Sequence, residues 1–217
     1  MGQSASPESV QEEVLSTYWR TDLTRFNYPQ RDEWVLWEET MKLVGRLVEV
    51  VQPRRVIEFG SGLSTVVLAS VVGRYGGRVL SFEHTARFAR RTANALWERQ
   101  LDQLARVAHR RLTLRRYGAK ILPTYAIRWS DFEEFQECEV ALIDGPPGWI
   151  GREATLYELF PRLAVGGWVV VDDMNRRRDR RWLQAWKRLY ANALDVQVFP
   201  AVGEGVALLR KLASRPE

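Results

Sequence analysis

A glycine-rich turn with an acid just before it lies in the stretch VIEFGSGLST, residues 56–65. The residues before the glycines are apolar and β-prone, which predicts a short buried strand. The glycines predict a tight turn into a helix, because glycine at 60 and 62 allows positive φ and lets the backbone come close to a ligand. A turn of this kind at the carboxyl end of a first strand is a typical small-molecule cradle.

The acid indicates which ligand the cradle would hold. Glu58 stands two residues before Gly60, where its carboxylate would repel a pyrophosphate and attract a cationic group. A dinucleotide loop would carry a third glycine, where this chain has Leu63-Ser64-Thr65. Ser64 or Thr65 can cap the following helix, whose amides then face the loop. The turn therefore predicts a pocket for a nucleoside with an amino group rather than for a diphosphate.

A second acid ends the next predicted strand, Arg78 to Glu83. Glu83 follows Glu58 by 25 residues, close to the spacing of a ribose-binding carboxylate in a βαβ unit. Ribose hydroxyls donate hydrogen bonds, and a carboxylate at the strand tip can accept two of them. His84 follows at the rim, where its ring could cover the adenine or the ribose.

Two further predicted strands also end on acids. The stretch VALIDGPPG is a buried strand that ends at Asp144, in a turn shaped by prolines and glycines. The stretch WVVVDD ends at Asp172 and Asp173, with Asn175 nearby. Ligands of open α/β sheets bind beyond the carboxyl ends of the strands, so these three aspartates are the candidate bases of the cleft.

Taken together, the motifs resemble those of class I S-adenosylmethionine-dependent methyltransferases over about residues 56–209. The loop with serine in place of the third glycine is similar to catechol-O-methyltransferase-like members. The resemblance implies S-adenosylmethionine as the cofactor, held by Glu58, Gly60, Ser61, Gly62, Ser64, Thr65, Glu83, His84, Tyr117 and Asp144. Tyr117 is assigned by position only, since the acid often found there is missing. Asp144 and Asp173 are implied to be the catalytic residues, near the transferred methyl group and the acceptor.

A magnesium ion is a second group that the resemblance raises. In metal-dependent catechol-type members, two aspartates and an asparagine from the tips of the fourth and fifth strands hold magnesium. Asp144 and Asp173 stand at the two aspartate positions, but Met174 follows where the pattern has asparagine, and Asn175 comes one position late. We therefore predict no metal ligand, although an oxygen-ligand magnesium site is chemically open to these residues. The ordinary role of the two aspartates is hydrogen bonding around the sulfonium or the acceptor.

The order of the predicted elements favours an α/β fold: a Rossmann-like, seven-stranded methyltransferase sheet with helices on both faces. Five strand–helix units precede two final strands, residues 195–199 and 205–209, whose short connection requires an antiparallel hairpin. A parallel dehydrogenase sheet would need a crossover there. In this scheme the helix after Thr85 ends near Leu101, or reaches Ala108 in two pieces, and residues 112–117 form the third strand at the sheet edge.

Length and composition fit one domain with an N-terminal addition. The pattern of residues 1–52 predicts a helical extension, with helices from Pro7 and from Asp32 to about Val51. Residues 53–217 are predicted to form the cofactor-binding domain. No apolar run approaches the roughly 20 residues of a membrane span. The start of the chain has no signal-peptide pattern, and the single cysteine, Cys138, fits a reducing cytoplasm. Two histidines and one cysteine argue against a zinc site of these ligands.

The leading functional hypothesis is O-methylation of a small-molecule or glycan-like acceptor. An aminopropyltransferase on the same sheet is an alternative, but it should carry further acids for a polyamine where this chain has the arginine-rich run Arg176 to Arg181. A non-catalytic module that binds RNA or a partner is another. The arginine run could bind an acidic acceptor, or be a solvated helix start with Asp179 pairing part of its charge. Because the net charge of +5 is modest, nucleic acid is not the expected partner; the oligomeric state is left open.

Overall fold

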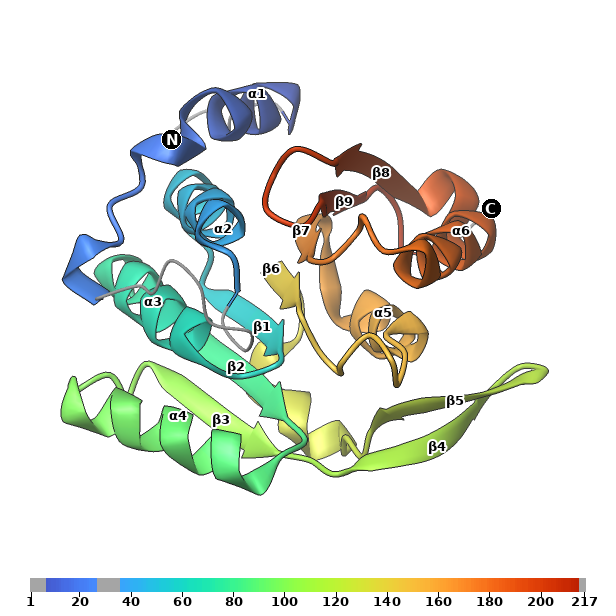
Figure 1. Ribbon diagram of the computed structural model, residues 1–217, viewed down its shortest axis with the longest axis horizontal. Helices are drawn as coiled ribbons and strands as arrows, with labels where there is room; N and C mark the ends of the chain where they lie inside the picture. Colours follow the sequence, from blue (N-terminus) through green and yellow to red (C-terminus); the bar gives the residue numbers. More distant parts are fainter. Residues whose placement is uncertain (1–6, 27–35, 215–217) are drawn as a thin grey trace.

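The computed structural model describes residues 7–26 and 36–214, drawn in colour in Figure 1. Its helices are α1 (Pro7–Thr17), α2 (Glu38–Val51), α3 (Leu63–Val72), α4 (Ala86–Glu98), α5 (Glu153–Leu159) and α6 (Arg177–Tyr190). Its strands are β1 (Arg55–Phe59), β2 (Arg78–Glu83), β3 (Ala105–His109), β4 (Leu112–Tyr117), β5 (Lys120–Tyr125), β6 (Cys138–Ile143), β7 (Leu163–Val171), β8 (Leu194–Phe199) and β9 (Val206–Lys211). Short 3-10 helices lie at Tyr18–Arg20, Thr24–Phe26, Gly73–Tyr75, Trp129–Phe135, Phe160–Arg162 and Ala191–Ala193.

Seven strands form one sheet in the order β3-β2-β1-β6-β7-β9-β8. Strands β3, β2, β1, β6 and β7 are parallel, and β9 pairs antiparallel with both β7 and β8. The sheet order therefore reverses between β1 and β6, and the carboxyl ends of these two strands open the crevice in which ligands of such sheets bind. The predicted seven-stranded sheet with its terminal antiparallel hairpin is confirmed.

Alternate residues of the central strands enter two separate cores, as the period of a β-strand requires. Val56, Val140 and Val170 pack with α1, α2 and α3 on one face. Ile57 and Ala141 pack with α5 and α6 on the other. Figure 1 shows the two helical layers on either side of the sheet, as predicted. Within residues 7–26 and 36–214, no helix is long and apolar enough to cross a membrane.

The third strand of the sheet is the place where the sequence interpretation was wrong. Residues 105–109, which were not predicted as a strand and fell largely in the helix only if it reached Ala108, form β3, whose small apolar residues face inward at the edge of the sheet. Helix α4 stops early because Gln100 takes a left-handed conformation (φ 58°) and Leu101 N–H donates to Leu96 O. Glycine usually marks this kind of helix end, and glutamine gave no such signal.

The stretch predicted as the third strand, β4, lies outside the main sheet. It forms a separate antiparallel hairpin with β5, in which Tyr117 pairs with Lys120 across the turn at Gly118. Figure 1 shows this hairpin reaching past α5. Tyr117 is consequently carried away from the edge of β2, where the position-based assignment had expected it.

The N-terminal helices share the core of the sheet. Val10 and Val14 of α1 and the apolar face of α2, with Met41 and Leu47 fully buried, belong to the same cluster as Val56. Helix α1 is confirmed where the sequence predicted it, and α2 ends at Val51 as expected. The predicted start of α2 near Asp32 and the tryptophan at 34 lie outside the described residues, whereas Trp37 is 37% exposed at the start of α2. The division of the chain at residue 52 stays a prediction.

The buried side chain of Glu58 fixes the turn between β1 and α3. Its side chain is fully buried, and both of its carboxylate oxygens accept hydrogen bonds from hydroxyls of Ser64, Thr65 and Ser81. The Ser64 and Ser81 bonds are each 2.6 Å long. The Thr65 hydroxyl also accepts from Gly62 N–H at 3.0 Å and so caps α3. One carboxylate thus fixes the end of β1, a residue of β2 and the first turn of α3.

This arrangement corrects the expected geometry of Glu58. The structure does not place its carboxylate in the cleft facing a cationic ligand, but beneath the loop. Burial raises the pKa of Glu58 to about 7, and the three hydroxyl donors only partly offset that effect. The folded protein therefore keeps a proton on Glu58 at pH values where the unfolded chain, with the ordinary pKa of 4.5, has lost it.

A pH-dependent stability difference follows for Glu58→Gln. Because the folded pKa is raised, the contribution of Glu58 to the free energy of unfolding is full below pH 4.5 and is lost as pH rises towards 7. We expect the wild type to lose about 2–4 kcal/mol relative to Glu58→Gln across that window. Urea denaturation at several pH values from 4.5 to 8 measures this difference. Glu134→Gln, at a side chain that is 72% exposed, is the control; parallel curves for wild type and Glu58→Gln would contradict the assignment.

Candidate functional site

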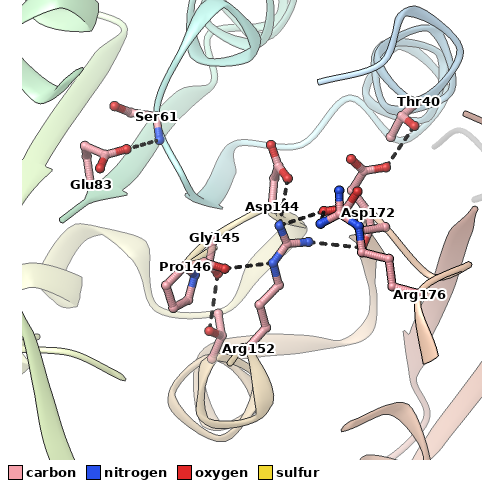
Figure 2. A network of polar contacts seen from close by, with 11 residues as sticks. Thr40, Ser61, Glu83, Asp144, Gly145, Pro146, Arg152, Asp172 and Arg176 are labelled. Carbon is pink, nitrogen blue, oxygen red and sulfur yellow. Dashed lines mark hydrogen bonds and ion pairs between the residues drawn. The ribbon is translucent and has the colours of Figure 1, made fainter. Parts of the chain in front are cut away.

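The acids predicted from the sequence gather at one edge of the sheet. Asp144 follows β6, Asp172 and Asp173 follow β7, and Glu83 ends β2, so three strand tips supply four acidic side chains to the crevice beside β1. Figure 2 shows Glu83 with Ser61 on one side of Asp144 and Asp172 with Thr40 on the other. The predicted gathering of acids at this edge is what the structure shows.

The glycine loop packs directly against the turn after β6. Gly60 has φ 99°, and a Cβ there would lie 3.2 Å from the carbonyl carbon of Asp144 and from Gly145 N. Glycine is therefore required at 60 both for its conformation and for this close approach. Gly62 differs from the prediction, because its φ of 179° is extended and a Cβ would meet no atom of the described residues within 4 Å. As far as residues 7–26 and 36–214 are concerned, the space beside Gly62 is open, as a cradle for a ligand needs.

Glu83 is fixed at the edge of this cradle. Its Oε2 accepts from Ser61 N–H at 3.1 Å and its Oε1 from Thr85 N–H at 2.7 Å. The His84 ring lies against it, with Nδ1 3.1 Å from Oε1, and is one-quarter exposed. Burial alone would raise the pKa of Glu83, but the donors from His84, Thr85 and Ser61 outweigh burial and lower it. Glu83 is thus held ionised, with lone pairs left to accept from a ligand.

Tyr117 does not join these residues. Its hydroxyl donates to Glu158 of α5, and its ring lies 5.3 Å from that of Tyr157. It lines a separate cavity of about 820 Å³ between the β4–β5 hairpin and helices α5 and α6. At the end of the true third strand, His109 lies opposite Glu83 in register, and its Nε2 is 3.2 Å from His84 O. The position-based assignment of Tyr117 to the cofactor pocket is therefore wrong, since it depended on the wrong third strand.

Asp144, Asp172 and Asp173 form one cluster, in which a carboxylate oxygen of each lies within 4.8 Å of the others. The Asp144 side chain is 27% exposed, whereas Asp173 is 7% exposed. Asp172 is buried and turns towards α2, where its Oδ1 accepts from the Thr40 hydroxyl at 3.0 Å. Of the three, Asp144 is the carboxylate that the cleft can reach.

Arg152 stands in the middle of this cluster, and sequence reasoning did not find it. Only 3% of its side chain is exposed, although it is an arginine. In Figure 2 it extends from the start of α5 up to the carboxylates. Its Nη2 donates to Asp144 Oδ1 at 3.2 Å and to Asp173 Oδ2 at 3.0 Å, its Nη1 to Asp172 O at 3.1 Å, and its Nε to Pro146 O at 2.9 Å. A signal was available: a cation just before the first turn of a helix is unfavourable there, and so needs another partner.

The cluster is electrostatically coupled. Burial raises the pKa of Asp144 to about 7, against the lowering effect of Arg152. Burial and the neighbouring carboxylates raise the pKa of Asp172 to about 8. Arg152 stays charged, because the surrounding carboxylates outweigh the burial that would lower its pKa. The charge on Asp144 is thus one of the causes of the raised pKa of Asp172.

The residues after Asp173 have other partners than those expected. The Asn175 side chain donates to Pro200 O, and the residue packs against Gly205, so it does not face the carboxylate cluster. Arg176 donates to Asp173 Oδ2 at 2.7 Å, and Arg178 donates to Trp149 O at 3.1 Å. Asp179 is fully buried, but neither of its carboxylate oxygens has a hydrogen-bond partner within the described part of the chain. Part of the arginine run thus closes the site from the side of α6 instead of standing free in solvent.

The carboxylate cluster does not fit a metal ion as it is built. The donor types suit a hard divalent cation, which binds carboxylate oxygens at about 2.0–2.6 Å. The space between Asp144 Oδ1 and Asp173 Oδ2, however, is filled by Arg152 Nη2, and Asp172 Oδ1 is engaged by Thr40. A guanidinium cannot be deprotonated in a protein, so it cannot make room for a second cation by losing its charge.

Comparisons with known proteins identify the family of the chain. A family model described as a methyltransferase domain matches residues 57–174. No curated protein matches the chain.

Among solved structures, an O-methyltransferase from Bacillus cereus in complex with S-adenosylhomocysteine is 16% identical, with a TM-score of 0.64 over 94% of this chain and 90% of that one. TomG from Streptomyces achromogenes, an O-methyltransferase involved in tomaymycin synthesis and solved with S-adenosylmethionine, is 17% identical, with a TM-score of 0.63 over 97% and 92%. A Thermotoga maritima S-adenosylmethionine-dependent O-methyltransferase is 15% identical, with a TM-score of 0.60 over 94% and 73%. These likenesses concern the fold. The family match extends over more than half of the sequence, and the chain therefore belongs to the methyltransferase-domain family, as a class I S-adenosylmethionine-dependent methyltransferase.

Proposed function

We propose that the protein transfers the methyl group of S-adenosylmethionine to an oxygen atom of a small-molecule or glycan-like acceptor. The observation that carries the proposal is the position of Asp144, a partly exposed carboxylate whose backbone lies against Gly60 of the cofactor loop. The O-methyltransferases of the same fold, described above, support oxygen as the methylated atom. The family match does not favour an aminopropyltransferase or a non-catalytic module.

The loop and the tip of β2 would hold the cofactor. The open space beside Gly62 would admit its amino-acid portion, Glu83 would accept from the ribose hydroxyls, and His84 would cover the sugar or the base. Glu58, Ser64 and Thr65 would act from below by keeping the loop in shape, while Ser61 positions Glu83 through its amide. The cofactor supplies an electrophilic methyl group on a positively charged sulfur.

Asp144 would act on the acceptor. In an in-line displacement the acceptor oxygen forms the new bond to the methyl carbon while the carbon–sulfur bond breaks, and the hydroxyl proton must leave. The Asp144 carboxylate, next to the loop, would receive that proton. Asp173 has a different task from the one predicted: it is almost fully buried and bound by Arg152 and Arg176, so we assign it to holding Arg152. Alignment of the two reactants by the cleft would supply much of the rate.

Two exposed tryptophans, on segments that contact the aspartate cluster, favour an acceptor with a flat apolar face. Trp149 is 75% exposed in the loop between β6 and α5, and Trp37 is 37% exposed close to Gly203 at the start of α2. These two segments lead to Arg152 and Thr40, which bind the aspartate cluster. Indole rings pack well on aromatic rings and on the apolar faces of sugars, which is why both acceptor classes stay in the proposal.

Replacement of Glu83 tests the cofactor site. Glu83→Ala should weaken S-adenosylhomocysteine binding by about 2–4 kcal/mol, or roughly 30- to 700-fold in Kd, because it removes charged hydrogen bonds to the ribose and the support of Ser61. Calorimetric titration measures this loss. Glu98→Ala, at a side chain that is 65% exposed on α4, should bind as the wild type does. Equal affinities of Glu83→Ala and wild type would refute this cofactor pocket.

The pH dependence of turnover tests Asp144. The base acts when it is ionised, and its pKa is raised to about 7 by burial, so kcat should increase as pH rises through about 7 and level off above it. Asp144→Asn should lower kcat by about 10²- to 10⁴-fold while it keeps S-adenosylhomocysteine affinity within about threefold. Release of S-adenosylhomocysteine with a panel of phenols and sugars measures kcat. A variant that retains full turnover would show that Asp144 is not the base.

A further inference from the structure

Arg152 occupies the position that a metal ion would need. Its Nη2 lies between Asp144 Oδ1 and Asp173 Oδ2, at 3.2 and 3.0 Å, and bridges a carboxylate that follows β6 to one that follows β7. A divalent ion shared by the same two oxygens would have to lie in the same gap. The ion and the guanidinium are both positive, so the two exclude each other by volume and by charge.

The other nitrogens of the guanidinium are also held by hydrogen bonds. Nε donates to Pro146 O in the turn after β6, and Nη1 donates to Asp172 O after β7. Four of its five N–H donors are thus directed at the two loops that carry the aspartates. Arg152 cannot swing away without leaving two backbone carbonyls and two carboxylates short of a donor, which is costly at a site only 3% exposed.

The charges of the cluster point the same way. Asp144, Asp172 and Asp173 bring three carboxylates into a space of 4.8 Å, and buried carboxylates so close together need a cation between them. Arg176 contributes a second positive charge at Asp173, but its side chain is 54% exposed and its hydrogen bond goes to Asp173. Arg152 is therefore the cation on which the position of Asp144 depends.

We propose that Arg152 is a resident cation that takes the place of a divalent metal in this aspartate cluster, so that the wild-type protein binds no divalent ion there and loss of the arginine converts the cluster into a divalent-cation site. Arg152 is then a positioning residue, which orients Asp144 through one of its oxygens. The inference concerns the aspartates alone and does not depend on the identity of the methyl acceptor.

Titration with Mn²⁺ tests the proposal without an activity assay. Mn²⁺ is a hard divalent ion that suits carboxylate oxygens, and its free form is counted directly by electron paramagnetic resonance. The wild type should show no saturable site up to millimolar Mn²⁺. Arg152→Met should bind one Mn²⁺ with a Kd at least about tenfold below that range. That site should vanish in the double variant Arg152→Met/Asp144→Asn. Mn²⁺ should also raise the Tm of Arg152→Met but not that of the wild type.

Two further variants keep the test decisive. Arg176→Met removes the exposed arginine from Asp173 and leaves Arg152 in place, so it should gain no Mn²⁺ site. Arg152→Lys retains a positive charge and should gain none either. If Arg152→Met does not fold, the wild type still decides. A saturable Mn²⁺ site in the wild type that Asp144→Asn removes would overturn the proposal. A folded Arg152→Met that binds no Mn²⁺ would overturn it as well.

Discussion

The main physical constraint on this structure is the free-energy cost of burying carboxylates at the carboxyl edge of the sheet. Glu58, Asp144, Asp172 and Asp173 all lie at or near the tips of central strands, where helices pack on both faces; Glu58, Asp172 and Asp173 are buried, and Asp144 is 27% exposed. An ionised carboxylate in such a place is stable only when donors or a cation compensate for the lost hydration. The loops around the cleft are arranged to supply that compensation.

The chain meets this requirement in two ways that match two different tasks. Under the cofactor loop, Glu58 is surrounded by hydroxyls and takes up a proton easily, which makes it a neutral support for a loop that must not move. Around Asp144, the compensating group is the guanidinium of Arg152, which lowers the pKa of Asp144 against the larger effect of burial. Hydroxyl donors thus hold the acid that supports the loop, and a guanidinium holds the acid proposed to accept a proton from a substrate.

The sequence predicts the sheet well and the site only in part, for reasons that differ from residue to residue. Strand tips are readable because hydrophobic runs end at acids, so Glu83, Asp144, Asp172 and Asp173 were found, and parallel strands then bring them together without further information. Tyr117 was misplaced because residues 105–109 were not predicted as a strand, which moved the third strand to residues 112–117. Glu58 was identified as a site residue, but the direction of its side chain was not predicted. That direction is set by the hydroxyls of Ser64, Thr65 and Ser81, which bind the carboxylate beneath the loop.

Arg152 was missed for a more general reason. Its place just before a helix signals that it needs a partner, but in a chain rich in arginines it does not identify one. Two partners lie 6 and 8 residues away in the turn after β6 and two lie 20 and 21 residues away after β7, and only folding brings them together. The backbone of Asp173 reflects the same assembly. It holds a left-handed conformation (φ 67°) that costs a non-glycine residue about 1–3 kcal/mol. At this bend Asp172 turns to Thr40 and Asp173 turns to Arg152, so two adjacent aspartates serve opposite walls of the cleft. The strained backbone therefore lies where the end of β7 contacts both α2, through Asp172, and Arg152, through Asp173.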